Sequence, residues 1–246
     1  AVLRLPGKQQ ALLDTLRKAG KPLVVVLMNG RPLCLEKVDE ESDALLEAWF
    51  PGTQCGNAVA DILFGDAVPS AKLTTSFPLT EGQIPNYYNY KRSGRPGDMP
   101  HSSTVRHIDV PNKNLYPFGY GLSYTTFSYG EMQCPQQFAA DGSLQVSGEV
   151  TNTGRFDSEE IVQLYVADKV ASMVRPVKEL KGFQKVFISK GQTKRVDFVL
   201  HAHDLGFWDN TMQYVVEPGT FEIMVGKNSE DLQKKDATWK GDSRTP

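Results

Sequence analysis

Six carboxylates gather within a short stretch of the sequence and are the first side chains to consider for acid and base chemistry. A carboxyl group that acts as a general acid needs a raised pKa, which an apolar pocket would supply. The sequence around these residues indicates no such pocket. We therefore interpret the stretch as a solvated, helix-capping or loop face and assign catalysis to none of its members, which are Glu36, Asp39, Glu40, Glu41, Asp43 and Glu47.

Metal and thiol chemistry have a similarly weak basis in the sequence. His201 and His203 form an H-x-H pair that could chelate a metal on one face of a strand, but no third ligand stands beside them. We interpret them as surface histidines and predict no metal site and no cofactor. Cys34, Cys55 and Cys134 have no CxxC spacing, so buried free thiols are expected. No nucleophile elbow or Walker motif occurs either.

Residues 1–80 are expected to alternate between helices and strands, and these elements would position any functional site in this half of the chain. An amphipathic helix is predicted from Pro6 to Gly20, because leucines recur at helical spacing between these start and stop signals. Residues 23–28 form an apolar run that is typical of a central parallel strand covered by helices on both sides. A second helix is predicted over residues 56–65, since a terminal glycine suits the left-handed end position.

Residues 42–50 are ambiguous between helix and strand. Their alanines, leucines and glutamate favour helix, whereas the following Pro51-Gly52 and the need for a strand before the next helix favour β. Two strands and two helices cannot cover both faces of a sheet and would leave a pairing edge exposed. We therefore expect the missing partner strands to lie upstream, and residues 1–80 not to fold alone.

The second half of the chain changes to a period of two. Residues 129–246 show alternating apolar positions with turn signals between the runs, which predicts an all-β sandwich. Residues 81–128 have no sustained periodicity and are interpreted as a long linker loop. The residues predicted to face the core of the sandwich are Leu144, Val146, Val150, Val162, Leu164, Val166, Val196, Phe198, Leu200, Phe221, Ile223 and Val225.

Charge and hydropathy exclude several classes of partner. The chain has 27 lysines and arginines against 29 aspartates and glutamates, and the basic residues are scattered, so no nucleic-acid partner is predicted. The longest apolar run, residues 22–28, is far shorter than the roughly 20 residues that cross a bilayer. The N-terminus has neither an initiator Met nor a signal-peptide pattern, so we expect a processed or truncated chain.

Five stretches of the sequence, in this order, resemble the C-terminal part of a glycoside hydrolase family 3 β-glucosidase. Each is a weak signal alone, but together they span nearly the whole chain and form a strong one. They are LRLPGKQQ (3–10), KPLVVVLMNGRPL (21–33), PGTQCGNAVADILFG (51–65), LYPFGYGLSYTTF (115–127) and RPVKELKGF (175–183).

The resemblance implies a fold class of α/β plus all-β. Residues 1–80 would be the second half of an open, flavodoxin-like α/β sandwich domain, followed by the linker over residues 81–128. Residues 129–246 would be a fibronectin type III-like β-sandwich. The resemblance also resolves residues 44–50 as a strand.

Family members of this kind cleave β-glycosidic bonds with retention, which requires two carboxyl groups about 5–5.5 Å apart. The resemblance implies an Asp nucleophile on an N-terminal (β/α)8 barrel and a Glu acid/base just before the stretch matched by residues 3–10. Neither motif is in this sequence. We therefore predict no catalytic residue here, and expect the chain to support the catalytic barrel of a retaining exo-β-glycosidase that acts on an oligosaccharide or glycoside.

Asn29, Gly30 and Arg31 are the candidate substrate-binding residues, at the rim of the active site. They follow the predicted central strand, and open α/β sheets bind ligands outside the carboxyl ends of their strands. Gly30 permits a tight turn, and Arg31 could hydrogen-bond a sugar hydroxyl or orient a carboxylate of the barrel. The alternative is a structural turn in which Arg31 is paired at the domain interface.

Aromatic side chains are concentrated around the linker and allow two interpretations. Their faces could stack on pyranose rings, but they more readily pin the linker onto both domains, with Gly119 and Gly121 letting the backbone pass between the rings. These residues are Tyr87, Tyr88, Tyr90, Tyr116, Phe118, Tyr120 and Tyr124.

The parent enzyme is expected to be periplasmic or secreted. The competing function is a non-catalytic module that binds polysaccharide or has a structural role.

Overall fold

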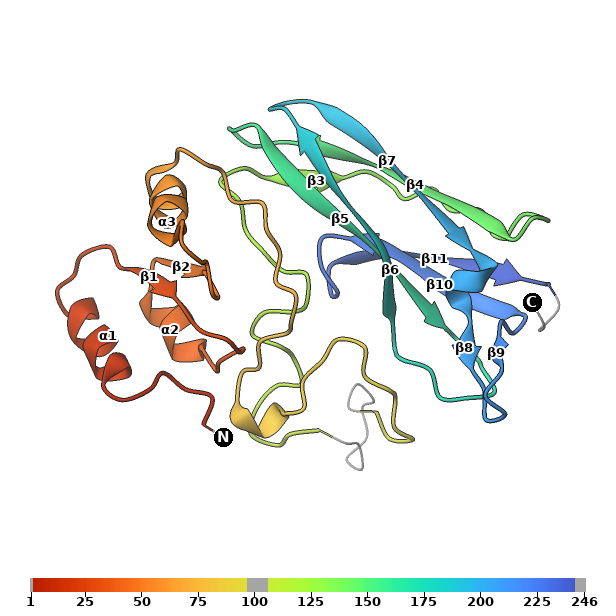
Figure 1. The fold of residues 1–246 in the computed structure, drawn as a ribbon, viewed down its shortest axis with the longest axis horizontal. Helices are drawn as coiled ribbons and strands as arrows, with labels where there is room; N and C mark the ends of the chain where they lie inside the picture. Colours follow the sequence, from red (N-terminus) through yellow and green to blue (C-terminus); the bar gives the residue numbers. More distant parts are fainter. Residues whose placement is uncertain (1, 97–105, 242–246) are drawn as a thin grey trace.

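The computed structural model describes residues 2–96 and 106–241 of the chain. Figure 1 shows an α/β region at the N-terminal end and a β-sandwich at the C-terminal end. A long connection joins them, and its two legs run side by side between the two regions.

Five elements make up the α/β region. Helix α1 (Gln9–Arg17) is followed by strand β1 (Val24–Leu27), helix α2 (Glu36–Glu41), strand β2 (Ala44–Glu47) and helix α3 (Cys55–Phe64). Strands β1 and β2 pair in parallel and form a sheet of two strands. The ambiguous segment is therefore a strand in its first part, as the resemblance implies.

The first helix is shorter than predicted, whereas the last one has the predicted end. Gly7 has φ 59°, outside the range of a right-handed helix, so α1 cannot begin at Pro6. Helix α3 ends at Gly65 with φ 84°, the left-handed conformation that a glycine adopts without strain.

Two features of the α/β region differ from the expectations. Strand β1 is not a central strand, because its sheet has only two strands within the described residues, and Val24 at its start remains 48% exposed. Helix α2 was not predicted, since its sequence is mostly charged. It is held in place by Leu35 and Val38, each only 1% exposed, which pack in the apolar core of this region.

The sandwich consists of two antiparallel sheets. The smaller has the strand order β3-β4-β7 and the larger has the order β11-β10-β5-β6. The bounds are β3 (Phe127–Tyr129), β4 (Ser143–Asn152), β5 (Ser158–Asp168), β6 (Glu179–Ile188), β7 (Thr193–His201), β10 (Gly219–Gly226) and β11 (Leu232–Trp239). Short elements at one end are η2 (Ala202–Leu205), β8 (Phe207–Trp208) and β9 (Tyr214–Val215).

Both sheets contribute to one continuous apolar core. All of the residues predicted to face inward are buried, from Leu144 on β4 to Val225 on β10. Alternation along each strand places every second side chain on the inner face, which is why the period of two locates this core correctly.

The connection is fixed to itself and to the sandwich. Residues 70–79 lie beside residues 115–121. The Phe77 backbone N–H donates to the Tyr116 carbonyl at 2.8 Å, and the Leu115 N–H donates to the Phe77 carbonyl at 2.9 Å. The Lys72 ammonium forms a buried ion pair of 3.2 Å with Glu160 on β5. A short 3-10 helix, η1 (Glu81–Gln83), follows the first leg.

Gly119 and Gly121 allow the backbone to approach its neighbours closely. The prediction that these neighbours are aromatic rings is wrong, because they are Gln163 and Ala71. A Cβ on Gly119 would lie 2.1 Å from Oε1 of Gln163, and a Cβ on Gly121 would lie 2.4 Å from the carbonyl oxygen of Ala71. The Gln163 amide donates to the Gly119 carbonyl at 3.1 Å. These glycines therefore let residues 115–121 of the connection pack closely against β5 and against residues 70–79.

Candidate functional site

The carboxyl ends of β1 and β2 lie side by side and bring Asn29 and Glu47 into contact. The Asn29 amide donates to one carboxylate oxygen of Glu47 at 3.1 Å, and the Trp49 backbone N–H donates to the other at 3.0 Å. The Asn29 side-chain oxygen in turn accepts from the Arg31 backbone N–H at 3.2 Å. Glu47 thus holds the predicted substrate-rim turn and the end of the neighbouring strand together.

Glu47 departs from the solvated face assigned to the carboxylate stretch. Burial raises its pKa, while the hydrogen bonds from Trp49 and Asn29 act in the opposite direction. Both of its oxygens accept hydrogen bonds from the protein, so this carboxylate positions the turn. Among the other members, Glu41 is half-buried, and Glu36, Asp39, Glu40 and Asp43 are exposed.

Gly30 is required by the packing of the turn. A Cβ at this position would lie 2.6 Å from the Cε2 and Cζ atoms of the Phe50 ring. Trp49, which precedes that ring, has φ 50°, a left-handed conformation that is uncommon for a tryptophan. The Glu47 hydrogen bond to the Trp49 N–H supports this strained position.

The three predicted rim residues have different roles in the structure. Asn29 is bonded to Glu47, and Gly30 lies against Phe50. The Arg31 side chain is exposed, and within residues 2–96 and 106–241 its guanidinium has no hydrogen-bond or ion-pair partner. The alternative of a paired Arg31 is therefore not seen in the described part of the chain.

A chain of aromatic contacts leads from this edge to the connection. Ring centroids are 5.8 Å apart for Trp49 and Phe77, 6.0 Å for Phe77 and Tyr116, and 5.2 Å for Tyr116 and Tyr120. The Tyr116 hydroxyl donates to Asp39 on α2. Burial and the neighbouring Asp39 carboxylate raise the pKa of Tyr116, so this hydroxyl stays a donor.

Most of the other aromatic residues also fix the connection. Tyr88 stacks on Phe118 at 4.3 Å, and the Tyr124 hydroxyl donates to the Ile62 carbonyl of α3 at 2.7 Å. Tyr87 and Tyr90 differ, because their side chains are 50% and 51% exposed. The pinning interpretation thus fits the stacked and bonded rings, and these two remain available to a ligand.

The remaining candidates do not converge on a site. His201 ends β7, whereas the His203 ring packs 4.9 Å from the Tyr214 ring, so the two do not share one strand face. In the described ranges no cluster of three histidine, cysteine or acidic side chains could hold a metal ion, and the three cysteines are free thiols. None of the helices there is long and apolar enough to span a bilayer.

Sequence reasoning missed the role of Glu47, although a signal for it existed. Glu47 occupies the last position of β2, and Leu27 opposite it ends β1 just before the rim turn. Parallel neighbours end at the same sheet edge, so a carboxylate there was a candidate partner for Asn29.

Comparisons with known proteins agree on one family. The family model described as "Glycosyl hydrolase family 3 C-terminal domain" matches residues 1–124, and the "Fibronectin type III-like domain" matches residues 160–229. The chain is 48% identical to a periplasmic beta-glucosidase of Salmonella typhimurium over 94% of its own length and 31% of that protein. It is 43% identical to a beta-xylosidase of Formosa agariphila over 98% of its own length and 33% of that protein.

Solved structures show the same similarity. The crystal structure of a beta-glucosidase from Listeria innocua in complex with glucose matches with a TM-score of 0.92 and 42% identity, covering 97% of this chain and 34% of that one. The chain thus spans about a third of the length of the relatives it matches. It belongs to glycoside hydrolase family 3, as the C-terminal region of a member in which the family's C-terminal domain is followed by a fibronectin type III-like domain.

Proposed function

We propose that this chain is the C-terminal region of a retaining exo-β-glycosidase of the β-glucosidase type, and that it supports the catalytic barrel without carrying the nucleophile. The observation that carries the proposal is the match of 94% of the chain to only 31% of a periplasmic beta-glucosidase, which leaves the larger part of such an enzyme outside this region. The substrate would be a terminal β-linked sugar of an oligosaccharide or glycoside.

The partner would be an N-terminal (β/α)8 barrel portion, in the same chain or in a separate one. In this arrangement residues 1–80 complete an α/β domain, residues 81–128 form the linker and residues 129–246 form the sandwich. Large apolar side chains of the α/β region support an interface, because Met28 is 60%, Phe50 82% and Phe64 84% exposed.

Asn29, Gly30 and Arg31 would form part of the rim of the active site. Glu47 fixes Asn29, and Phe50 covers Gly30, so the Arg31 backbone is held while its guanidinium has no partner within residues 2–96 and 106–241. A guanidinium with unused donors can bond a sugar hydroxyl or orient a carboxylate of the barrel. Location in the periplasm or outside the cell is supported by the relative of Salmonella typhimurium, a periplasmic protein.

A chimera tests this function. The matched third of the Salmonella typhimurium protein is replaced by this chain, and hydrolysis of 4-nitrophenyl β-D-glucopyranoside is measured. The chimera is expected to hydrolyse the glucoside, and the relative without its C-terminal third is not. This chain alone should show no turnover that survives purification, because a glycosyl-enzyme cannot form without its nucleophile. An inactive but folded chimera, or an active isolated chain, contradicts the proposal.

The rim is tested in the same chimera. Loss of a hydrogen bond from a charged group lowers kcat/KM by about tenfold, so Arg31→Ala should have this effect with an unchanged melting temperature. Arg155→Ala, at an exposed position of the sandwich, is the matched control and should leave kcat/KM unchanged. Equal kcat/KM values for the two variants would remove Arg31 from the rim.

A further inference from the structure

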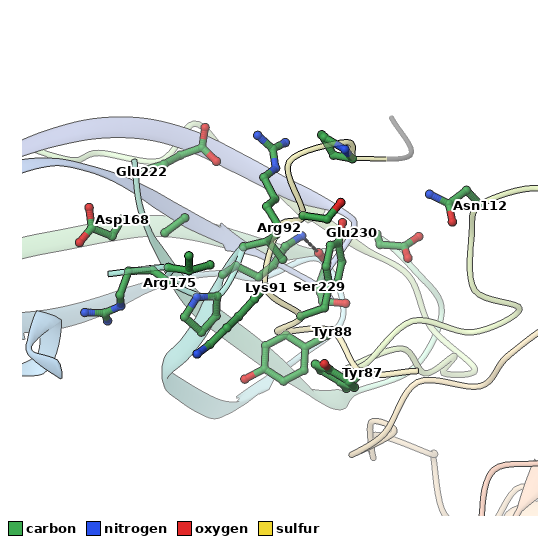
Figure 2. A pocket seen from close by; sticks show the side chains of 18 of the residues that line it. Tyr87, Tyr88, Lys91, Arg92, Asn112, Asp168, Arg175, Glu222, Ser229 and Glu230 are labelled. Atoms are coloured by element: carbon green, nitrogen blue, oxygen red, sulfur yellow. Dashed lines mark hydrogen bonds between the residues drawn. The ribbon is translucent and has the colours of Figure 1, made fainter. Parts of the chain in front are cut away.

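A cleft of about 1270 Å³ lies between the connection and the outer side of the sandwich. We call it the linker cleft. One wall comes from residues 83–96 and 106–114 of the connection, and the other comes from residues 167–178, Glu222, Met224, Ser229, Glu230 and Lys234. Figure 2 shows side chains of both walls around the same space, with Tyr87 and Lys91 from the connection and Asp168 and Glu222 from the sandwich. Its volume exceeds that of ordinary small-ligand sites, roughly 300–1,000 Å³, and is sufficient for an extended ligand.

The two walls are tied together, so the cleft is preformed. The Val177 backbone N–H donates to the Tyr90 carbonyl at 2.9 Å, and Lys91 and Pro176 form an antiparallel bridge. The Leu180 N–H donates to the Tyr88 hydroxyl at 3.2 Å. These bonds place Tyr90 and Lys91 beside Val177 and its neighbour Lys178.

The lining of the linker cleft is positively charged. It contains eight lysines and arginines against three carboxylates, whereas the whole chain has 27 against 29. Three of these cations are already paired: Lys234 with Glu222 at 3.1 Å, Arg175 with Glu179 at 2.9 Å and Lys169 with Asp236 at 2.6 Å. The excess points to an anionic ligand.

Lys178 is the lining cation whose charge a bound anion would stabilise most. It is half-buried, and its ammonium donates to the Ser229 carbonyl at 2.5 Å, but no carboxylate of the described residues lies within ion-pair distance. Burial lowers the pKa of Lys178. By contrast Lys181, three residues further on, pairs with Glu179 at 3.5 Å. A partly buried cation without a counter-ion is unfavourable, and a bound anion would remove that cost.

Other groups in the linker cleft suit a sugar. The half-exposed rings of Tyr87 and Tyr90 offer faces on which a pyranose can stack, and the Asp168 carboxylate can accept from hydroxyls. The buried amide nitrogen of Asn86 has no acceptor among the described residues. The three carboxylates in the lining repel a uronate and a phosphate alike, so the choice of a sugar rests on the tyrosine faces and on the Asp168 acceptor for hydroxyls.

We propose that the linker cleft binds an acidic oligosaccharide, with a uronate carboxylate held by Lys178 and Lys91 and a pyranose ring against Tyr90. Binding requires no hydrolysis and none of the barrel. The binding proposal is therefore independent of the function proposed above, and binding can be measured on this chain alone.

Isothermal titration of the full chain tests the class of ligand. Tetragalacturonate is the acidic probe, cellotetraose the neutral one and a hexathymidylate the polyanion without hexuronic acids. Binding of tetragalacturonate that is at least about tenfold tighter than that of the other two supports the proposal, since a charge-assisted hydrogen bond contributes on this scale. No binding of tetragalacturonate, equal binding of cellotetraose or tighter binding of the oligonucleotide overturns it.

Two substitutions locate the site. Lys178→Met should weaken tetragalacturonate binding by about tenfold, and Lys181→Met, whose ammonium is already paired outside the cleft lining, should not change it. Lys91→Ala, at an exposed position, should also weaken tetragalacturonate binding. This variant tests the location of the site if the Lys178 variant does not fold. Equal affinity for Lys91→Ala and the unsubstituted chain overturns the assignment.

Discussion

The sandwich and the α/β region each bury an apolar core, but the sandwich core lies between two sheets, whereas the α/β core lies against a sheet of only two strands. The two sheets of the sandwich face each other, and residues such as Val146, Ile188 and Ile223 have no exposed surface. In the α/β region the sheet has two strands, and Leu12, Val24 and Phe64 remain 58%, 48% and 84% exposed. We therefore expect the α/β region not to fold as an independent unit.

The physical reason lies in how each type of sheet is covered. Antiparallel sheets can pack face to face and keep their outer faces in water. A parallel sheet needs helices on both faces and enough strands to present those faces. The α/β region has too few strands, so its apolar surface fits contact with a partner.

Separating the two regions is the strongest test of this comparison. A fragment of residues 122–246 keeps Thr125, whose hydroxyl bonds the buried Asn152 at 2.6 Å, and should show a cooperative calorimetric melt. A fragment of residues 1–80 should associate through its exposed apolar surface and elute larger than a monomer in light-scattering chromatography. A monomeric, cooperatively folded 1–80 fragment would break the comparison.

Breaking the attachment of the connection to the sandwich should have the next largest effect on the unfolding free energy. Glu160→Ala would leave the Lys72 ammonium, 12% exposed, without its counter-ion and the Tyr129 hydroxyl without its 2.9 Å acceptor. Loss of one member of such a buried pair costs about 3–5 kcal/mol, measured by urea unfolding. Glu131→Ala removes an exposed pair with Lys235 and is the control, with an unchanged midpoint. Equal midpoints for both variants would show that the connection is only loosely attached.

Single truncations compare a core position of the sandwich with an exposed apolar position of the α/β region. Ile223→Ala in the sandwich, where the side chain is fully buried, should cost about 2–5 kcal/mol of unfolding free energy. Leu63→Ala on α3, where the side chain is 42% exposed, should cost less than about 1 kcal/mol. Chemical denaturation of the full chain measures both, and a cost at Leu63 as large as at Ile223 would contradict the exposure of this face of α3.

Ionisation of Glu47 should have the smallest effect on stability, and this effect should be confined to the α/β region. Burial raises its pKa above the ordinary value of 4.5, so the folded state binds the proton more tightly than the unfolded chain. Its contribution to stability is then present below about pH 4.5 and is lost as the pH rises through the raised pKa. Hydrogen exchange of the β1 and β2 amides should show this loss, and Glu47→Gln should abolish it. An identical pH profile in the variant would contradict the assignment.

Local patterns predicted the elements with strong periodicity. Alternation along the sandwich strands located its core, and Gly65 marked the end of α3 because a left-handed residue there favours glycine. Weak patterns failed: the charged helix α2 carries only Val38 as a buried residue, so its amphipathic signal is too short to detect. Residues 42–50 needed the family resemblance to be resolved as a strand, since their propensities favour helix.

The sequence by itself determined the sandwich strands, the side chains that face the sandwich core and the end of α3, because these follow from local spacing, and its motifs determined which family it resembles. Only the tertiary structure decided that Glu47 bonds Asn29, that Glu160 pairs with Lys72 and that Lys178, near Tyr90, has no counter-ion among the described residues. These contacts join residues from separate elements. They depend on the path of the chain in space, which periodicity along the sequence does not encode.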